Sequence, residues 1–257
     1  SFYSTIANDY QEPMYYIHTQ AEGALDYTTL FYIPSVAPMD MYQPDYNPGV
    51  KLYVKRVFIT DDEKELMPTY LRFVRGIIDT EDLPLNVSRE ILQQNKVLSK
   101  IRSNSVKKIL SEIEKMTTDT EKYKTFFEQF GRPIKEGLYQ DHENKDTLLE
   151  LVRFKSTKSD DLVSFADYES RMVSDQKTIY YITGGTENTL RNSPLLEMYK
   201  TKDVEVLILD DEIDEIIISS VPKYKDFSLK SDTHSDAAEE LKDESDKDAE
   251  KSLKPLI

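Results

Sequence analysis

Cysteine is absent from this sequence of 257 residues, and histidine is scarce. Without cysteine the chain can have no disulfide bond, no thiolate metal ligand and no cysteine nucleophile. The three histidines, His18, His142 and His234, are more than 90 residues apart, which argues against a histidine metal cluster or a histidine-based triad. We therefore expect no metal site. A chain without cysteine also fits a reducing compartment, and we expect a cytoplasmic protein.

Basic residues are under-represented, above all near the start of the chain. Residues 1–50 contain no lysine or arginine, and the whole sequence has 33 basic against 48 acidic residues, a formal net charge of -15. This charge repels phosphate backbones and anionic lipid surfaces. The longest apolar runs, such as residues 206–209 and 216–218, are far shorter than the roughly 18 to 20 residues that span a bilayer. We expect neither a nucleic-acid partner nor a membrane partner.

The overall composition is that of a folded chain. Hydrophobic residues make up 39% of the sequence and charged residues 32%, which is enough to bury a core, and the length favours roughly two folded units. Tyr27, Phe31 and Ile33 lie on one face of a strand by their alternation, whereas Leu66 and Tyr70 recur at helical spacing. Strands and helices alternate along the chain, which predicts an α/β layer arrangement with mixed sheet directions. The expected elements are strands at 25–35, 50–59, 76–78, 177–183 and 204–209, and helices at 61–75, 89–116, 146–154 and 186–200.

Three further segments divide the chain. Residues 38–49 contain three prolines and a glycine and predict a loop. We expect its Met39, Met41 and Tyr42 to be at least partly exposed, although packing of these side chains against the sheet is an equally open alternative. Residues 117–146 are polar and weakly periodic, which predicts a short helical connector. Residues 231–257 are acidic and poor in large apolar side chains, as in a charged linker or tail.

One basic segment stands out in this acidic chain. Residues 86–108 contain six basic residues and one acid, Glu90. On a continuous helix Arg89, Gln93, Lys96 and Lys100 would form one stripe of hydrogen-bond donors, opposite an apolar face. Free backbone N–H groups in the first turn also favour an anion, so a phosphate group is a natural ligand. A solvated basic face on an ordinary amphipathic helix is the more common explanation of such a pattern.

Two other candidates favour structural roles. Gly184 and Gly185 follow a predicted strand and precede a predicted helix, without a complete phosphate-loop pattern, and indicate a tight turn. The acidic run at 210–215 lacks the alternating ligand spacing of a calcium loop. It fits the start of a helix, where acids cap free N–H groups.

The basic segment begins with a motif that carries a family resemblance: Asp82-Leu83-Pro84-Leu85-Asn86-Val87-Ser88-Arg89-Glu90. With the segments 31–34, 52–61, 123–137, 180–184 and 213–215, this motif makes nearly the whole chain similar to the middle domain of the heat shock protein 90 chaperone family, of the bacterial type called high-temperature protein G. The resemblance implies a large and a small α/β/α subdomain joined by a short helical linker. We expect a large subdomain at 1–118, a connector at 119–145, a small subdomain at 146–230, and a charged linker with the start of a third domain at 231–257. The chain would then be a piece of a longer protein.

The resemblance also implies roles for individual residues. In the family, the arginine that matches Arg89 reaches the terminal phosphate of ATP held in a separate N-terminal domain, and Gln93 and Asn86 match its supporting residues. If exposed, Met39, Met41 and Tyr42 would give an adaptable apolar surface for client proteins or for the N-terminal domain. The implied partners are client proteins and the protein's own N-terminal ATPase and C-terminal dimerisation domains. ATP would be the cofactor of a full-length homodimer, with none bound to this chain alone, and the isolated chain would be a monomer without enzyme activity.

Two other functions remain open from the residues alone. One is a free-standing enzyme that binds a phosphate ligand at Arg89 and the basic stripe, although no general base, metal cluster or complete phosphate loop accompanies that stripe. The other is an interaction scaffold with no catalytic role.

Overall fold

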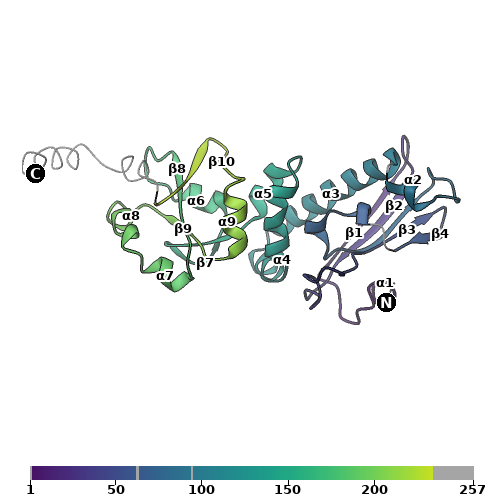
Figure 1. Cartoon of the computed structure of the whole chain (residues 1–257), viewed down its shortest axis with the longest axis horizontal. Helices are drawn as coiled ribbons and strands as arrows, with labels where there is room; N and C mark the ends of the chain where they lie inside the picture. The colour runs from purple at the N-terminus through teal and green to yellow at the C-terminus, as the bar shows by residue number, and fades with distance from the viewer. Residues whose placement is uncertain (1, 62–63, 94, 234–257) are drawn as a thin grey trace, which may run out of the picture. The chain divides into compact units, whose positions relative to one another are not determined.

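The computed structural model describes residues 2–61, 64–93 and 95–233, apart from the side chains of Lys64, Arg89 and Ile91. The chain divides into two compact units, Ser1–Leu151 and Val152–Ile257 (Figure 1). Most of the predicted tail, residues 231–257, lies outside the described residues. In the described part, no helix is both long and apolar enough to cross a membrane.

The first unit is built on a five-stranded sheet. Its strands are β1 (Tyr15–Ala21), β2 (Tyr27–Ile33), β3 (Gly49–Val54), β4 (Val57–Thr60) and β5 (Arg75–Thr80), in the order β1-β2-β5-β3-β4. Only β3 and β5 run parallel, and the other neighbours are antiparallel. The strands predicted at 25–35 and 76–78 are therefore present. The single strand predicted at 50–59 is instead the hairpin of β3 and β4, which turns at Lys55 and Arg56, both with positive φ. Strand β1 was missed because polar and apolar side chains mix along it.

One face of this sheet is buried under helix α3 (Lys96–Met116). Phe31, Ile78 and Leu52 are at most 1% exposed and lie on the neighbouring strands β2, β5 and β3, where Leu52 pairs with Ile78 and Phe31 pairs with Gly76. Helix α3 lies along this sheet in Figure 1. Its Ile101, Ile109 and Ile113 recur at helical spacing and are fully buried. The opposite face is partly covered by the short helix α1 (Phe2–Ala7), whose Tyr3 ring packs on Tyr32 at 5.0 Å between centroids.

Gly76 in β5 allows β2 to pair closely with β5. Its φ of 151° is unfavourable for residues with a side chain, and a Cβ atom there would lie 2.1 Å from the carbonyl oxygen of Leu30. Gly76 thus lies inside a central strand, where β2 approaches too closely for any side chain.

Helices at the end of the first unit differ from the predicted ones. The predicted helix at 61–75 is wrong: the described residues form two 3-10 turns, η1 (Lys64–Leu66) and η2 (Thr69–Leu71). Pro68 lies between them with an extended ψ of 151°, and its ring and missing N–H prevent a continuous helix. The predicted connector is instead a long helix, α4 (Thr120–Gln140), followed by α5 (Lys145–Leu151).

Aromatic side chains explain why α4 belongs to the first unit. Tyr123, Phe126, Phe127 and Phe130 are all buried, and Phe73 stacks on Phe130 with 4.4 Å between ring centroids. The cluster was read from the sequence as part of a polar segment, although its spacing of three and four residues is that of one helix face. The boundary between units consequently lies after Leu151 rather than at residue 145.

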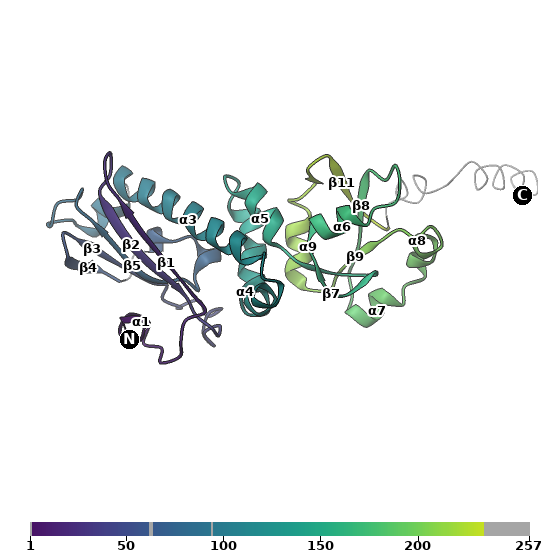
Figure 2. The ribbon, with the colours of Figure 1, turned by 180° about the vertical axis from the view of Figure 1, so that it is seen from behind.

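The second unit contains a six-stranded sheet in the order β10-β11-β8-β9-β6-β7, seen from both sides in Figures 1 and 2. Strands β11, β8 and β9 are parallel, whereas β10 is antiparallel to β11, β6 is antiparallel to β9 and β7 is antiparallel to β6. Helices cover both sheet faces, as in an α/β/α arrangement. The elements are β6 (Phe154–Ser156), β7 (Ser159–Val163), α6 (Phe165–Ser170), β8 (Thr178–Thr183), α7 (Glu187–Arg191), η3 (Pro194–Leu196), α8 (Glu197–Thr201), β9 (Val206–Leu209), α9 (Glu212–Ile218), β10 (Lys223–Tyr224) and β11 (Phe227–Ser231).

The two structural roles predicted in this unit are confirmed. Gly184 follows β8 with a φ of 94°, as a tight turn requires. Asp211 caps α9 by accepting a hydrogen bond from the N–H of Ile213 at 3.2 Å, and Asp214 completes a capping box. The neighbouring Asp210 pairs with Lys155 at 2.6 Å.

Candidate functional site

The segment 81–95, which carries the predicted catalytic residues, is tied at its start to the β1–β2 hairpin. The backbone N–H of Asp26 donates to Asp82 Oδ2 at 2.6 Å, and the N–H of Glu81 donates to the carbonyl of Asp26 at 3.0 Å. Thr80, fully buried at the end of β5, accepts a hydrogen bond from the N–H of Asp82 at 3.2 Å. These bonds fix where the chain leaves the sheet.

Buried leucines hold the rest of the segment. Leu83 and Leu92 are 3% and 4% exposed, respectively. Between and beside them, Leu85, Asn86 and Gln93 are exposed. The segment therefore has an apolar anchor at each end and offers polar side chains to solvent in between, as a presented binding loop requires.

Arg89 opens the short helix α2 (Arg89–Gln93) within this segment. The N–H of Leu92 bonds to the carbonyl of Ser88 at 3.1 Å, which closes the first turn. Arg89 and Gln93 are four residues apart in this helix and so lie on the same side of it. The Arg89 side chain is outside the described part of the structure, and its accessibility and resting partner stay predictions.

The predicted single helix over 89–116 is wrong, because the chain breaks before α3. Asn95 is extended, with a φ of -82° and a ψ of 119°, and its side chain accepts hydrogen bonds from the N–H groups of Val97 at 2.8 Å and Leu98 at 3.2 Å. Asparagine in this position starts a new helix instead of continuing the old one. The proposed stripe of Arg89, Gln93, Lys96 and Lys100 is consequently divided between two helices.

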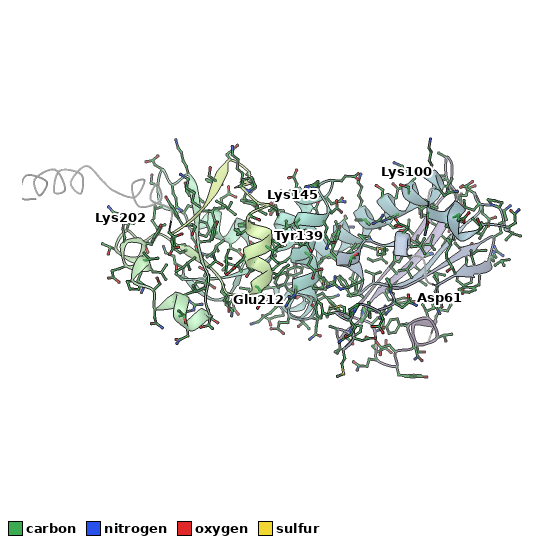
Figure 3. The ribbon with its side chains drawn as sticks, viewed as in Figure 1. Asp61, Lys100, Tyr139, Lys145, Lys202 and Glu212 are labelled. Atoms are coloured by element: carbon green, nitrogen blue, oxygen red, sulfur yellow. The ribbon has the colours of Figure 1, made fainter. Side chains whose placement is uncertain are left out.

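Two cations on the first turns of α3 still face solvent. Lys96 and Lys100 are exposed, and Lys100 points away from the sheet (Figure 3). Within the described residues neither lysine pairs with a carboxylate. Cationic side chains near a helix N-terminus are unfavourable for the helix itself, so their presence here is consistent with a role toward an anionic partner.

The loop at 38–49 is anchored by Met41, which is only 1% exposed. The prediction that Met41 is at least partly exposed is therefore wrong. A turn closed by the N–H of Met41 and the carbonyl of Pro38 directs its side chain inward, and Arg72 Nε donates to the Met41 carbonyl at 3.1 Å. Burial of a methionine side chain stabilises the loop by about 1.5–3 kcal/mol.

The other two predicted residues on this loop are exposed. Met39 is fully exposed and Tyr42 is 54% exposed. The Tyr42 ring lies 5.1 Å from the guanidinium carbon of Arg72 and 5.6 Å from that of Arg132. Val36, exposed at 51%, precedes them in the chain. We call Val36, Met39, Tyr42 and Arg132 the loop surface. Arg132 was not predicted, since only the fold brings α4 to this loop, and Val36 lies just before the predicted loop at 38–49.

The described residues also bear on whether the chain could hold a metal ion or a small ligand. They contain no group of three or more metal-ligating side chains. A cavity of about 370 Å³ in the first unit is lined mainly by polar residues, including Tyr70, Arg102 and Asp141. The Tyr70 hydroxyl donates to Asp141 Oδ2 at 2.6 Å, and burial together with this bond raises the pKa of Tyr70 well above its usual range.

Comparisons with known proteins give a consistent result. A family model described as "Hsp90 protein" matches residues 1–257. The chain is 61% identical over 266 residues to the chaperone protein HtpG of Treponema denticola, and 56% identical over 257 residues to that of Borreliella afzelii. Both alignments cover 100% of this chain and 42% of the relative, so the chain spans less than half the length of these relatives.

A solved structure is similar to the fold. The middle domain of a Plasmodium falciparum heat shock protein aligns with a TM-score of 0.81 and 33% sequence identity, covering 91% of this chain and 93% of that one. The predicted α/β fold with a large and a small part is confirmed by this likeness.

Proposed function

The chain belongs to the Hsp90 protein family, and from this we propose that it is the middle segment of an ATP-dependent molecular chaperone. The observation that supports this most directly is the likeness of nearly the whole chain to a structure that is itself a middle domain. The length of the HtpG relatives leaves room for further domains on the same protein. We propose that an N-terminal ATPase domain and a C-terminal dimerisation domain accompany this segment in a cytoplasmic homodimer.

In this proposal Arg89 contacts the terminal phosphate of ATP held by the N-terminal domain. A guanidinium is permanently charged and planar, so it can donate two parallel hydrogen bonds to phosphoryl oxygens as charge develops there. Such an arginine can raise the rate of phosphoryl transfer by roughly 10³ to 10⁵. Gln93, on the same side of α2, and Asn86, exposed before it, would orient the arginine or the phosphate.

The anchoring of the segment supports this role. Thr80, Asp82 and the two buried leucines hold α2 against the first unit while its polar residues face outward. Lys96 and Lys100 add positive charge close by in the sequence. A site supplied to another domain needs this combination of rigid support and exposure, because a loosely held arginine loses its advantage of orientation.

The loop surface is proposed to contact client proteins. It combines a flexible, polarizable methionine with an aromatic ring between two guanidinium groups, and it is held by a buried methionine from the same loop. Methionine and aromatic side chains adapt to many apolar sequences, which suits a surface with varied partners.

A client-crosslinking experiment on the full-length protein tests this surface. We expect the double change Met39→Ser with Tyr42→Ser to reduce crosslinking of a denatured model protein, with an unchanged melting temperature. Tyr10→Ser provides a matched control, because Tyr10 is 89% exposed but lies outside the loop surface. Equal crosslinking by both variants and the parent protein would remove the loop surface from the proposal.

Titration of ATP into the isolated chain and into the full-length protein separates the main proposal from a free-standing phosphate enzyme. We expect the full-length protein to bind ATP and the isolated chain to show no saturable binding. Tight binding and hydrolysis by the isolated chain would instead identify a complete site on this segment. If no substitution in segment 81–95 changes the ATPase rate of the full-length protein, the result would favour a scaffold without a catalytic role.

A further inference from the structure

The two sheets have four outer strands, and these differ in how they are protected. An outer strand exposes a row of unpaired N–H and C=O groups that can pair with another chain, and most proteins block such edges with charges, bulges or very short strands. In the first unit the outer strands are β1 and β4, and in the second they are β10 and β7.

Three of the four edges carry these protective features. Strand β10 has only two residues, and one of them is Lys223. Strand β7 contains Asp160 and Asp161 and pairs with β6 through a shifted register. Strand β4 has four residues, also pairs through a register shift, and follows directly after Arg56.

Strand β1 has none of them. It is seven residues long, Tyr15–Ala21, and pairs with β2 in seven consecutive residue pairs without a shift. It contains no proline, no glycine, no acid and no lysine or arginine. Within the described residues β1 pairs with no strand other than β2, and Figure 2 shows it as the outermost strand of its sheet.

The charge around this edge defines what could bind there. Residues 1–50 contain six acids and no lysine or arginine, and exposed Glu12 and Glu22 lie shortly before and directly after β1. Lys122 on α4 lies over the Tyr15 ring, with its Nζ 4.8 Å from the ring centre. Tyr16, exposed at 66%, and His18 project from β1 on one face, where they can pair with side chains of a neighbouring strand.

We propose that the edge of β1 accepts an extended polypeptide segment with basic residues as an added sixth strand of the first sheet. Main-chain hydrogen bonds would provide most of the affinity, so many sequences could bind. A second copy of this chain is disfavoured as the occupant, since its β1 would bring the same acids to the edge. That the natural partner is an unfolded client rests on the proposed chaperone function, whereas the strand addition itself does not.

The test uses two fluorescent nine-residue peptides and the 257-residue chain. The probe is Lys-Val-Thr-Val-Lys-Val-Thr-Val-Lys, and the control peptide has proline in place of each valine, which keeps the charge but removes backbone donors. We expect the probe to bind about tenfold or more tightly than the control peptide, because strand pairing needs those donors. Amide hydrogens of β1 should exchange more slowly when the probe is bound.

Charge-changing variants locate the binding. The double change Tyr16→Lys with His18→Lys should weaken binding of the probe and strengthen binding of a second peptide in which glutamate replaces each lysine. A misfolded variant would bind both peptides more weakly, so stronger binding of the glutamate peptide excludes misfolding. Val57→Lys on the opposite edge, where Val57 is 49% exposed, should leave probe affinity unchanged.

Several results would overturn strand addition at β1. The first is equal affinity of the chain for the probe and the proline peptide, and the second is a Val57→Lys variant that binds the probe as weakly as the Tyr16→Lys, His18→Lys variant does. The third is slower amide hydrogen exchange in strands other than β1 when the probe is bound, and the fourth is dimerisation of the free chain through β1. Loss of probe binding in the Met39→Ser, Tyr42→Ser variant would move the contact to the loop surface. Retained binding in that variant keeps the two surfaces separate, so either can fail without the other.

Discussion

Arg72 and Glu136 form a bidentate ion pair in the interior of the first unit. Two guanidinium nitrogens of Arg72 donate to the Glu136 carboxylate at 2.7 and 3.0 Å, and the side chains are only 10% and 14% exposed. The same guanidinium donates to the carbonyls of Met41 at 3.1 Å and Thr69 at 2.9 Å. One arginine thus joins the loop at 38–49, η2 and α4, and it positions Tyr42 for the loop surface.

We expect Glu136→Gln to lower the free energy of unfolding by about 3 kcal/mol, since it leaves a buried arginine without its counter-charge. Urea denaturation measures this change. Glu143→Gln is the matched control: Glu143 pairs with Lys107 at 2.6 Å, but both side chains are more than half exposed, so its effect should be below about 1 kcal/mol. Equal losses in the two variants would show that burial of the Arg72 pair is unimportant.

Ser105→Ala should stabilise the protein. Ser105 is 3% exposed on α3, and its hydroxyl oxygen has no hydrogen-bond partner in the described structure. Removing an unsatisfied buried hydroxyl is expected to gain about 1 kcal/mol or more. Ser99→Ala, an exposed change on the same helix, should gain only the helix-propensity difference of about 0.5 kcal/mol. A thermal melt in which Ser105→Ala gains no more than Ser99→Ala would contradict the burial argument.

The ion pairs of Glu112 predict that the protein loses stability in acid. Lys108 and Lys115 each donate to its carboxylate at 2.8 Å and, with the Tyr15 hydroxyl at 2.9 Å, lower the pKa of Glu112 to about 2. Because this pKa is below the ordinary value of 4.5, the stabilisation is complete above pH 4.5 and disappears as pH falls toward 2.

The variant Glu112→Gln should therefore lose stability at pH 7 but little near pH 2. We expect a loss of only about 1 kcal/mol, because the side chains of Lys108 and Lys115 are 41% and 64% exposed to screening solvent. Denaturation at a series of pH values measures the difference between parent and variant. A difference that stays constant from pH 7 to pH 2 would show that the effect is steric.

Asp232 predicts the opposite pH dependence. Burial raises the pKa of Asp232 to about 6, and its Oδ2 has no hydrogen-bond partner among the described residues. The folded chain thus favours the protonated acid, so stability falls as pH rises from 3.8 to 6 and stays lower at neutral pH. Asp232→Asn should raise the melting temperature at pH 7.5 and have little effect at pH 4. The same gain at both values would exclude titration of Asp232 as the cause.

Local patterns predicted the elements whose residues face one environment along their whole length. Alternation at Tyr27, Phe31 and Ile33 identified β2, and apolar spacing identified α3, because burial of one face determines both. The cap at Asp211 was also predictable, since a capping residue acts on its own neighbours in the chain.

Features that depend on distant partners were not predictable. Met41 is buried because Arg72 holds its carbonyl, and Tyr42 meets Arg132 only once α4 has packed. The helix break at Asn95 reflects competition between two local structures of similar energy, a helix that continues and a side chain that caps. The role proposed for Arg89 would depend on a separate domain, so neither its spacing nor its helix could suggest that role; it came from the family resemblance.

Single-turnover ATP hydrolysis by the full-length protein tests the central proposal most directly. Arg89→Ala should slow hydrolysis by about tenfold or more while nucleotide affinity and melting temperature stay unchanged, because a contact to developing charge acts on turnover and not on ground-state binding. Lys96→Ala, a change of a nearby exposed cation, should have a much smaller effect, and Arg89→Lys should restore activity only in part. Unchanged turnover in Arg89→Ala, or a fall in melting temperature that accounts for the lost activity, would contradict a catalytic contact from this segment.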